Sequence, residues 1–126
     1  MTTAPSKQRL CALNDIPDPG TLEFAAGGGE WPPRGILVRY QGAVYAYLNR
    51  CPHAGDLLNW GANSFFAPGR ALLHCTSHGA LFKPDSGECV EGPCLGRRLR
   101  PIEVEVIGGE IFLVGPMPSN LGPYAG

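Results

Sequence analysis

The 126-residue chain carries ten basic and eleven acidic residues, a balance that excludes the strongly basic surface of a nucleic-acid-binding domain. No apolar run reaches the length of a transmembrane helix, and residues 1–10 lack the basic-then-apolar order of a signal peptide. With 18 glycines, 13 prolines and 44% hydrophobic residues, the composition favours short strands joined by turns in one domain, residues 1–126. We therefore expect a soluble, cytoplasmic, all-β protein with no nucleic-acid or membrane partner.

The first half of the chain contains four predicted strands, which are residues 8–13, 21–26, 35–40 and 43–48. The last two form a predicted hairpin, because Gln41-Gly42 between them has the chemistry of a two-residue turn. This hairpin leads directly into Cys51.

The second half contains five further predicted strands, which are residues 71–74, 80–82, 88–90, 102–107 and 110–114. Gly108-Gly109 predicts a second hairpin between the last two. Aliphatic and acidic residues alternate over 102–106, as in a strand with one wet face. Nothing in the chain has helical periodicity over a convincing length.

Two short segments carry chemistry, Cys51-Pro52-His53 and Cys75-Thr76-Ser77-His78. Each supplies one thiolate and one imidazole, and glycine follows each pair, at Gly55 and Gly79. Two Cys and two His in a two-plus-two arrangement suit a [2Fe-2S] centre with two Cys on one iron and two His on the other.

A tetrahedral zinc site also accepts two Cys and two His, so a zinc-stabilised interaction module without a redox role is the alternative. Zinc sites of this composition usually separate a Cys pair from a His pair, whereas both pairs here are mixed. The single residue between Cys51 and His53 is also tight for chelating one ion. The iron-sulfur interpretation is therefore favoured.

The two segments together resemble the Rieske family, and the chain resembles a small Rieske-type ferredoxin over nearly its whole length. The resemblance implies an antiparallel β sandwich or barrel, with a cluster-binding subdomain at about 51–95 inserted into a base formed by the remainder. It implies that the cluster ligands are Cys51, His53, Cys75 and His78. It also implies that a proline-containing loop, Gly92-Pro93-Cys94, covers the cluster.

Departures from the high-potential branch of this family predict a low potential. That branch has a disulfide between the two ligand loops, where this chain has Asp56 and Ser77. It also has a serine hydroxyl bonded to a cluster sulfide, where this chain has Ala80. Fewer hydrogen bonds to sulfur favour the reduced state less, so we expect a midpoint of about −150 mV. The stretch 54–74 is longer than in typical members, and we interpret it as a surface loop rather than a partner-facing elaboration.

The remaining cysteines and histidine have structural interpretations. Cys11 lies in an apolar stretch and is expected to be a buried hydrophobe. A disulfide between Cys89 and Cys94 is possible but is disfavoured in a reducing compartment. His74 has no place in the motif and is expected to be a strand residue.

The arginine run and the two tryptophans can also be interpreted from the sequence. The run Arg97-Arg98-Leu99-Arg100 either steers an acidic redox partner or forms a charged strand edge. Trp31 and Trp60 are expected to be packing residues rather than electron conduits.

The resemblance implies an electron-transfer protein similar to the ferredoxin component of aromatic-ring dioxygenases, with no catalytic residues of its own. Its partners would be a flavin-containing reductase as donor and a terminal oxygenase as acceptor. The alternative within the family is a Rieske subunit of a larger oxidoreductase, such as a nitrite reductase. A terminal oxygenase itself is disfavoured, because it needs a further iron site and His74 is the one histidine outside the motif.

Overall fold

The computed structural model describes residues 7–26, 34–50, 65–66, 71–75, 79–93, 95–115 and 117. Strands dominate these residues, as predicted, and the all-β class is confirmed. The elements are β1 Gln8–Ala12, the short 3₁₀ helix η1 Leu13–Asp15, β2 Gly20–Ala25, β3 Arg34–Tyr40, β4 Ala43–Leu48, β5 Leu73–His74, β6 Leu81–Phe82, β7 Cys89–Glu91, β8 Val104–Ile107 and β9 Glu110–Leu113. Within the described ranges no helix is long and apolar enough to cross a membrane.

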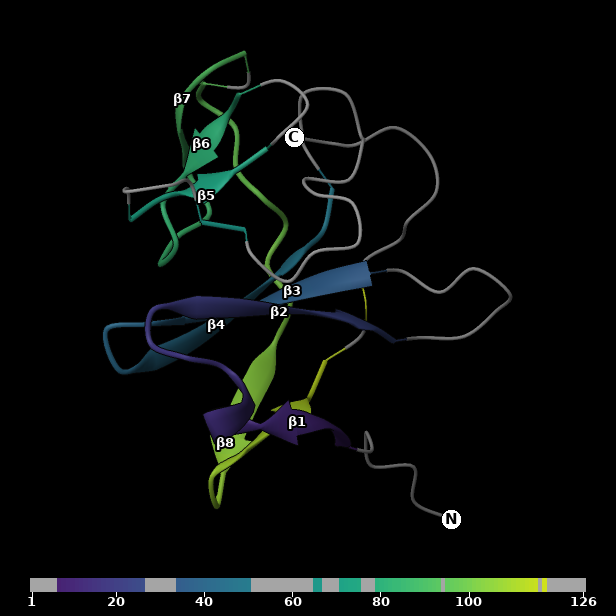
Figure 1. Ribbon diagram of the computed structural model, residues 1–126. Coiled ribbons are helices and arrows are strands. Elements are labelled where there is room, and N and C mark those ends of the chain that lie inside the picture. Colours follow the sequence, from purple (N-terminus) through teal and green to yellow (C-terminus); the bar gives the residue numbers. More distant parts are fainter. Residues whose placement is uncertain are drawn as a thin grey trace.

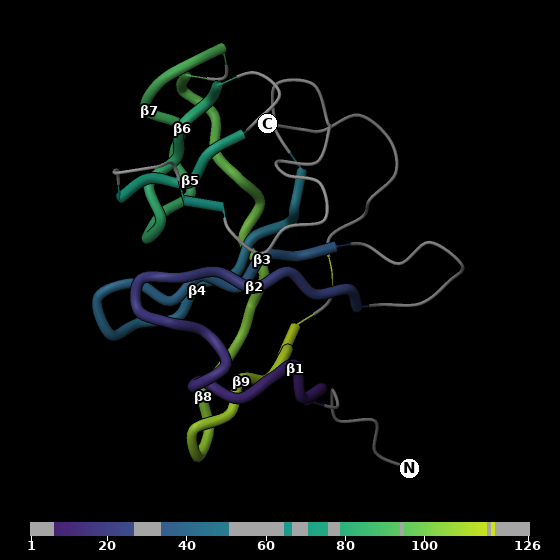
Figure 2. Tube along the Cα trace, in the orientation of Figure 1, coloured from purple at the N-terminus to yellow at the C-terminus, as the bar shows by residue number. Residues whose placement is uncertain are grey.

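The strands form three antiparallel sheets of three strands each. We call them the base sheet (order β1-β9-β8), the central sheet (β2-β3-β4) and the tip sheet (β5-β6-β7). Figure 1 shows the central sheet between the other two, with the tip sheet above it and the base sheet below. The trace in Figure 2 shows how the chain leaves β7 and descends past the central sheet to reach β8.

Side chains of the central sheet alternate between two hydrophobic cores, because successive residues of a strand point to opposite faces. Ile36 and Val38 of β3 face the tip sheet, while Leu37 between them faces the base sheet. The tip core consists of Ile36, Val38, Tyr47, Phe65, Leu73, Cys75, Ala80, Phe82, Cys89 and Leu99. The base core consists of Cys11, Ile16, Ala26, Leu37, Ala46, Leu48, Ile102, Ile111 and Leu113.

Both predicted hairpins are confirmed. Gln41 and Gly42 both have positive φ, at 50° and 81°, as the tight turn between β3 and β4 requires. The Asp18 carboxylate accepts hydrogen bonds from both of their amides, at 3.0 and 2.9 Å, and so holds this turn. Gly108 and Gly109 form the corresponding turn between β8 and β9.

One predicted strand, residues 102–107, is divided in the structure. Its regular part, β8, begins at Val104, whereas the Ile102 amide donates to the Ala46 carbonyl at 2.8 Å. A β-bridge between Tyr47 and Pro101 continues this pairing. The segment therefore first extends the central sheet along β4 and then crosses to the base sheet. Its alternating sequence does not reveal this change of partner.

Candidate metal centre

Cys75, one of the four predicted ligands, lies fully buried at the end of β5. Its amide donates to the Ala80 carbonyl at 2.9 Å, and the Gly79 amide donates to the Cys75 carbonyl at 2.8 Å. These two bonds close the segment between Cys75 and Ala80 into a tight loop. Gly79 has φ +74°, a conformation that glycine adopts without the Cβ penalty of other residues. Backbone hydrogen bonds thus fix Cys75 to Gly79 and Ala80, the described residues that follow it in the chain.

The other three predicted ligands lie outside the described residues. So do several residues of the sequence analysis, namely Trp31, Cys51, His53, Gly55, Asp56, Trp60, Ser77, His78 and Cys94. Within the described ranges no three His, Cys, Asp or Glu side chains gather as a metal site. The full ligand set therefore stays a prediction, with Cys75 as the member whose surroundings are known.

His74 is a strand residue, as predicted. It belongs to β5, pairs with Leu81 of β6, and donates its amide to the Phe65 carbonyl at 2.7 Å. This bond joins the residue before Cys75 to the middle of the long stretch 54–74 between the two predicted pairs. Cys75 consequently follows a backbone position that is fixed on both sides.

The chain beyond β7 lies against the loop that contains Cys75. Gly92 has φ +102°, and a Cβ at this position would stand 2.7 Å from the Cα atom of Ala80. Only glycine allows this approach of two backbones. The Leu95 amide then donates to the Gly92 carbonyl at 3.3 Å, so the chain turns back above Ala80. The predicted role of this proline-containing turn as a cluster cover stays a prediction, but its contact with the second ligand loop is established.

Cys11 and Cys89 occupy different cores. Cys11 is buried in the base core, as predicted, and burial raises the pKa of its thiol. Cys89 is buried in the tip core, and its Sγ donates to the Glu91 carbonyl at 3.2 Å. The predicted choice between a thiol and a disulfide with Cys94 is not decided by these contacts, because Cys94 lies outside the described residues.

The run Arg97-Arg98-Leu99-Arg100 begins beside β7 and forms an edge of the tip sheet there. The Cys89 amide donates to the Arg97 carbonyl at 2.9 Å, and Arg98 forms a β-bridge with Glu88. Leu99 is fully buried between exposed Arg98 and half-buried Arg100. This alternation matches the predicted charged strand edge, while the steering of an acidic partner stays a prediction.

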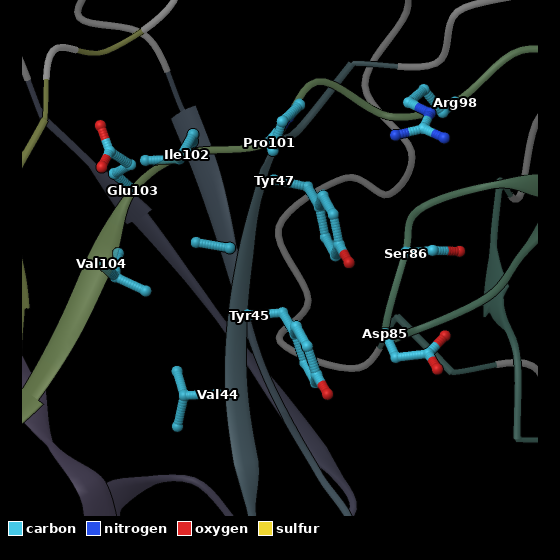
Figure 3. A pocket seen from close by; sticks show the side chains of 11 residues that line it. Val44, Tyr45, Tyr47, Asp85, Ser86, Arg98, Pro101, Ile102, Glu103 and Val104 are labelled. Carbon is cyan, nitrogen blue, oxygen red and sulfur yellow. The ribbon is translucent and has the colours of Figure 1, made fainter.

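An open groove of about 460 Å³ separates β4 from the turn between β6 and β7. Figure 3 shows the rings of Tyr45 and Tyr47 projecting from β4 toward Asp85 and Ser86 of this turn, with Arg98 above them. The groove lining contains neither Cys nor His, so the groove is distinct from the predicted ligand set. The lining residues are Val44, Tyr45, Ala46, Tyr47, Asp85, Ser86, Arg98, Pro101, Ile102, Glu103 and Val104.

Two groups of polar contacts were not predicted from the sequence. The Tyr47 hydroxyl donates to the Pro84 carbonyl, and Glu23 of β2 accepts hydrogen bonds from Arg34 and Asn49. Asn49 lies two residues before Cys51, and this position marks it as a residue near the predicted site. Its partner Glu23, 26 residues away, cannot be identified from a single sequence.

The donor chemistry fits an iron-sulfur cluster. Iron in such clusters is held by thiolates and, in the mixed type, by two imidazoles, and the chain offers two of each at the predicted positions. Cys75 adds a structural observation, since its side chain is withdrawn from water among apolar groups. Shielding from solvent is one of the factors that tune such centres.

Structures similar to the whole chain are ferredoxins and the corresponding part of oxygenases. The ferredoxin of carbazole 1,9a-dioxygenase from Nocardioides aromaticivorans IC177 is 27% identical, with a TM-score of 0.69, and the match covers 89% of this chain and 99% of that one. A chain in the complex of reduced oxygenase and oxidized ferredoxin in carbazole 1,9a-dioxygenase is 23% identical, with a TM-score of 0.70 and coverage of 91% and 98%. The terminal oxygenase of carbazole 1,9a-dioxygenase from Novosphingobium sp. KA1 is 20% identical, with a TM-score of 0.71, and the match covers 91% of this chain but 31% of that one.

No curated protein sequence matches the chain at a significant level. The sequence profile of the Rieske [2Fe-2S] domain, in contrast, matches residues 6–114, which is most of the chain. With its all-β fold and the buried Cys75 at the end of β5, the chain belongs to the Rieske [2Fe-2S] domain family, whose members bind a [2Fe-2S] cluster.

Proposed function

We propose that this chain is a small electron-transfer protein that accepts single electrons from a flavin-containing reductase and passes them to a terminal oxygenase. The observation that carries the proposal is the likeness to a dioxygenase ferredoxin. That ferredoxin is 27% identical, and the match covers 89% of this chain and 99% of that one. We further propose the cytoplasm as its location.

The proposed ligands are Cys51, His53, Cys75 and His78. A [2Fe-2S] cluster bound there supplies reversible one-electron chemistry. The protein holds the ligands and excludes water from the buried side. The side chains around Cys75 do this second task, because Ile36, Leu73 and Phe82 of the tip core are each fully buried.

The acceptor is proposed to dock on the turn that lies against Ala80. Leu95 at this turn is 67% exposed, the largest exposure of a large apolar side chain in the described residues. A single exposed apolar side chain can anchor a small interface by filling a pocket on the partner. Because Gly92 in the same turn contacts the second ligand loop, an acceptor bound at Leu95 lies beside the proposed cluster. Docking at this position would therefore place the acceptor's redox centre close to the proposed cluster.

The experiment that tests this function has two parts. Purified protein is analysed for iron, sulfide and zinc, and its dithionite-reduced form is measured by low-temperature EPR. We expect two irons per chain and a rhombic signal with an average g value below that of the free electron. One zinc per chain and no EPR signal would instead support the non-redox interaction module.

The second part measures electron transfer directly. The reduced protein is mixed anaerobically with a purified terminal oxygenase, and reoxidation is followed by visible absorbance. We expect the absorbance of the oxidised protein to return at a rate that rises with oxygenase concentration. An intact cluster that no oxygenase and no reductase oxidises or reduces faster than buffer alone would contradict the proposal.

A further inference from the structure

Two polar side chains of β2, Thr21 and Glu23, contact the two segments that lead into the predicted ligand pairs. As alternate residues of a strand, they project from the same face. That face is turned toward the tip sheet, because their register partners in β3, Val38 and Ile36, belong to the tip core.

Glu23 holds the segment before Cys51. Its side chain is 9% exposed and accepts two hydrogen bonds from Arg34, at 2.8 and 2.6 Å, and a third from Asn49 Nδ2 at 2.5 Å. A nearly buried carboxylate requires such pairing, and a bidentate arginine contact is the strong form of it. Asn49 is 1% exposed and also donates its amide to the Arg34 carbonyl at 2.8 Å. Backbone and side chain of Asn49 are therefore both fixed two residues before Cys51.

Thr21 holds the segment before Cys75 through one intermediate residue. Its Oγ1 accepts a hydrogen bond from the buried Phe65 amide at 3.1 Å. The Phe65 carbonyl in turn accepts the His74 amide at 2.7 Å, and Phe66 forms a β-bridge with Leu73. His74 immediately precedes Cys75, so two successive hydrogen bonds, from Thr21 to Phe65 and from Phe65 to His74, connect Thr21 with the second ligand loop.

We infer that Thr21 and Glu23 are positioning residues for the cluster, because they fix the chain before Cys51 and the chain before Cys75 to the same rigid strand. The spacing between the two ligand pairs then depends on β2. A satisfied polar network inside a core specifies geometry more sharply than apolar packing does. This inference rests on the proposed function only in taking Cys51, His53, Cys75 and His78 as ligands.

The test compares variants that keep shape with variants that remove one hydrogen bond. Thr21→Val removes the acceptor of the Phe65 amide and keeps the branched side chain, while Thr21→Ser keeps the hydroxyl. Glu23→Gln keeps an oxygen for Asn49 but removes the charge that pairs with Arg34. Tyr47→Phe is the matched control, because it removes a buried hydrogen bond that ends at Pro84, away from both ligand segments.

The measurements use the cluster-loaded protein under anaerobic conditions. Iron release to a chelator is followed by loss of visible absorbance, and the EPR line widths and the thermal unfolding midpoint are recorded on the same samples. We expect Thr21→Val and Glu23→Gln to release iron about tenfold faster, as the loss of a buried hydrogen-bond partner implies, with broadened EPR lines. Thr21→Ser and Tyr47→Phe should release iron at nearly the wild-type rate, although Tyr47→Phe lowers the unfolding midpoint.

Three results would overturn the inference alone while the wild type still carries its cluster. The first is wild-type iron release and EPR line widths in both Thr21→Val and Glu23→Gln. The second is equal acceleration by Thr21→Ser, which would assign the effect to packing. The third is equal acceleration by Tyr47→Phe, which would assign it to general stability. A wild-type protein that takes up no cluster on reconstitution would overturn the proposed function and this inference with it.

Discussion

The Tyr47 hydroxyl donates a 2.9 Å hydrogen bond to the Pro84 carbonyl, which joins β4 of the central sheet to the turn between β6 and β7. Tyr47 is 3% exposed, so the bond is shielded from water. We predict that Tyr47→Phe lowers the free energy of unfolding by about 1–2 kcal/mol, because the Pro84 carbonyl loses its buried donor. Urea denaturation followed by circular dichroism measures this loss. Tyr45→Phe in the same groove is the control, and we expect a change of less than about 0.5 kcal/mol, since Tyr45 is half-buried. Equal costs for both variants would contradict the role of the hydroxyl bond.

Tyr47 also makes stability depend on alkaline pH. Burial, and secondarily the negative charge of Asp85, raise the pKa of the Tyr47 phenol above its ordinary value. Because the folded pKa is the higher one, this contribution is complete below the unfolded tyrosine pKa of about 10 and is lost as pH rises toward the folded value. We expect the unfolding midpoint of the wild type to fall more steeply above this pH than that of Tyr47→Phe. Parallel decline of the two proteins between neutral and strongly alkaline pH would show that Tyr47 does not titrate in this way.

Gly87 lies against the Tyr47 ring. Replacing it with alanine should cost stability in two ways, through backbone strain and through a clash with this ring. Its φ is +75°, and an added Cβ would stand 2.9 Å from Tyr47 Cε1. We predict that Gly87→Ala loses about 1–2 kcal/mol from left-handed strain and about 1–3 kcal/mol more from overpacking. Gly109→Ala is the control, because Gly109 has a similar φ of +79° and open space around its Cβ position. Denaturant midpoints should therefore fall further for Gly87→Ala, and identical midpoints would argue against the steric part.

The reduction potential tests the interpretation of Ala80. We expect a midpoint of about −150 mV in a spectroscopic redox titration, since the chain lacks the hydroxyl donor of high-potential members. Ala80 is fully buried beside Gly92, in the loop that contains Cys75. Ala80→Ser should raise the midpoint by tens of millivolts if its hydroxyl reaches a cluster sulfide. Ala80→Cys is the comparison variant of similar size with a weaker donor, and a strongly positive midpoint in the wild type would refute the low-potential assignment.

The exposed apolar side chains test the proposed docking surface. We predict that Leu95→Ser raises the protein concentration needed for half-maximal oxygenase turnover by about tenfold, the effect of losing an interface anchor. Val106→Ser is the matched control, because Val106 is also an exposed apolar residue, at 42%, but lies on β8 in the base sheet. Steady-state turnover with purified reductase and oxygenase distinguishes the two. Loss of turnover with Val106→Ser but not with Leu95→Ser would place the docking surface at the other end of the molecule.

Local chemistry made much of the fold predictable. Gln41-Gly42 and Gly108-Gly109 identified the two hairpins, because their turns need positive φ at both positions. The contrast between His74, a strand residue, and Cys75, a loop residue, also followed from the motif spacing. In each of these cases the signal and the structure lie within a few residues of each other.

Contacts across long sequence separations were not predictable in the same way. The sequence gives no sign that Glu23 pairs with Asn49, or that Ile102 pairs with Ala46 before the chain crosses to the base sheet. Such pairs depend on how sheets stack, and stacking is decided by the whole core rather than by one segment. All four proposed ligands also remain predictions, and what the structure establishes is the burial of Cys75.

Because side chains alternate along β3, substitutions at even-numbered and odd-numbered positions of this strand should have different effects. Even-numbered positions, such as Ile36 and Val38, support the layer that carries the second ligand loop, and Leu37 between them supports the base. A substitution at an even position should therefore disturb the cofactor and the fold together, whereas one at an odd position should disturb mainly the fold. The base half of such a protein can accordingly diversify in sequence, or be rebuilt by design, while its redox centre is left unchanged.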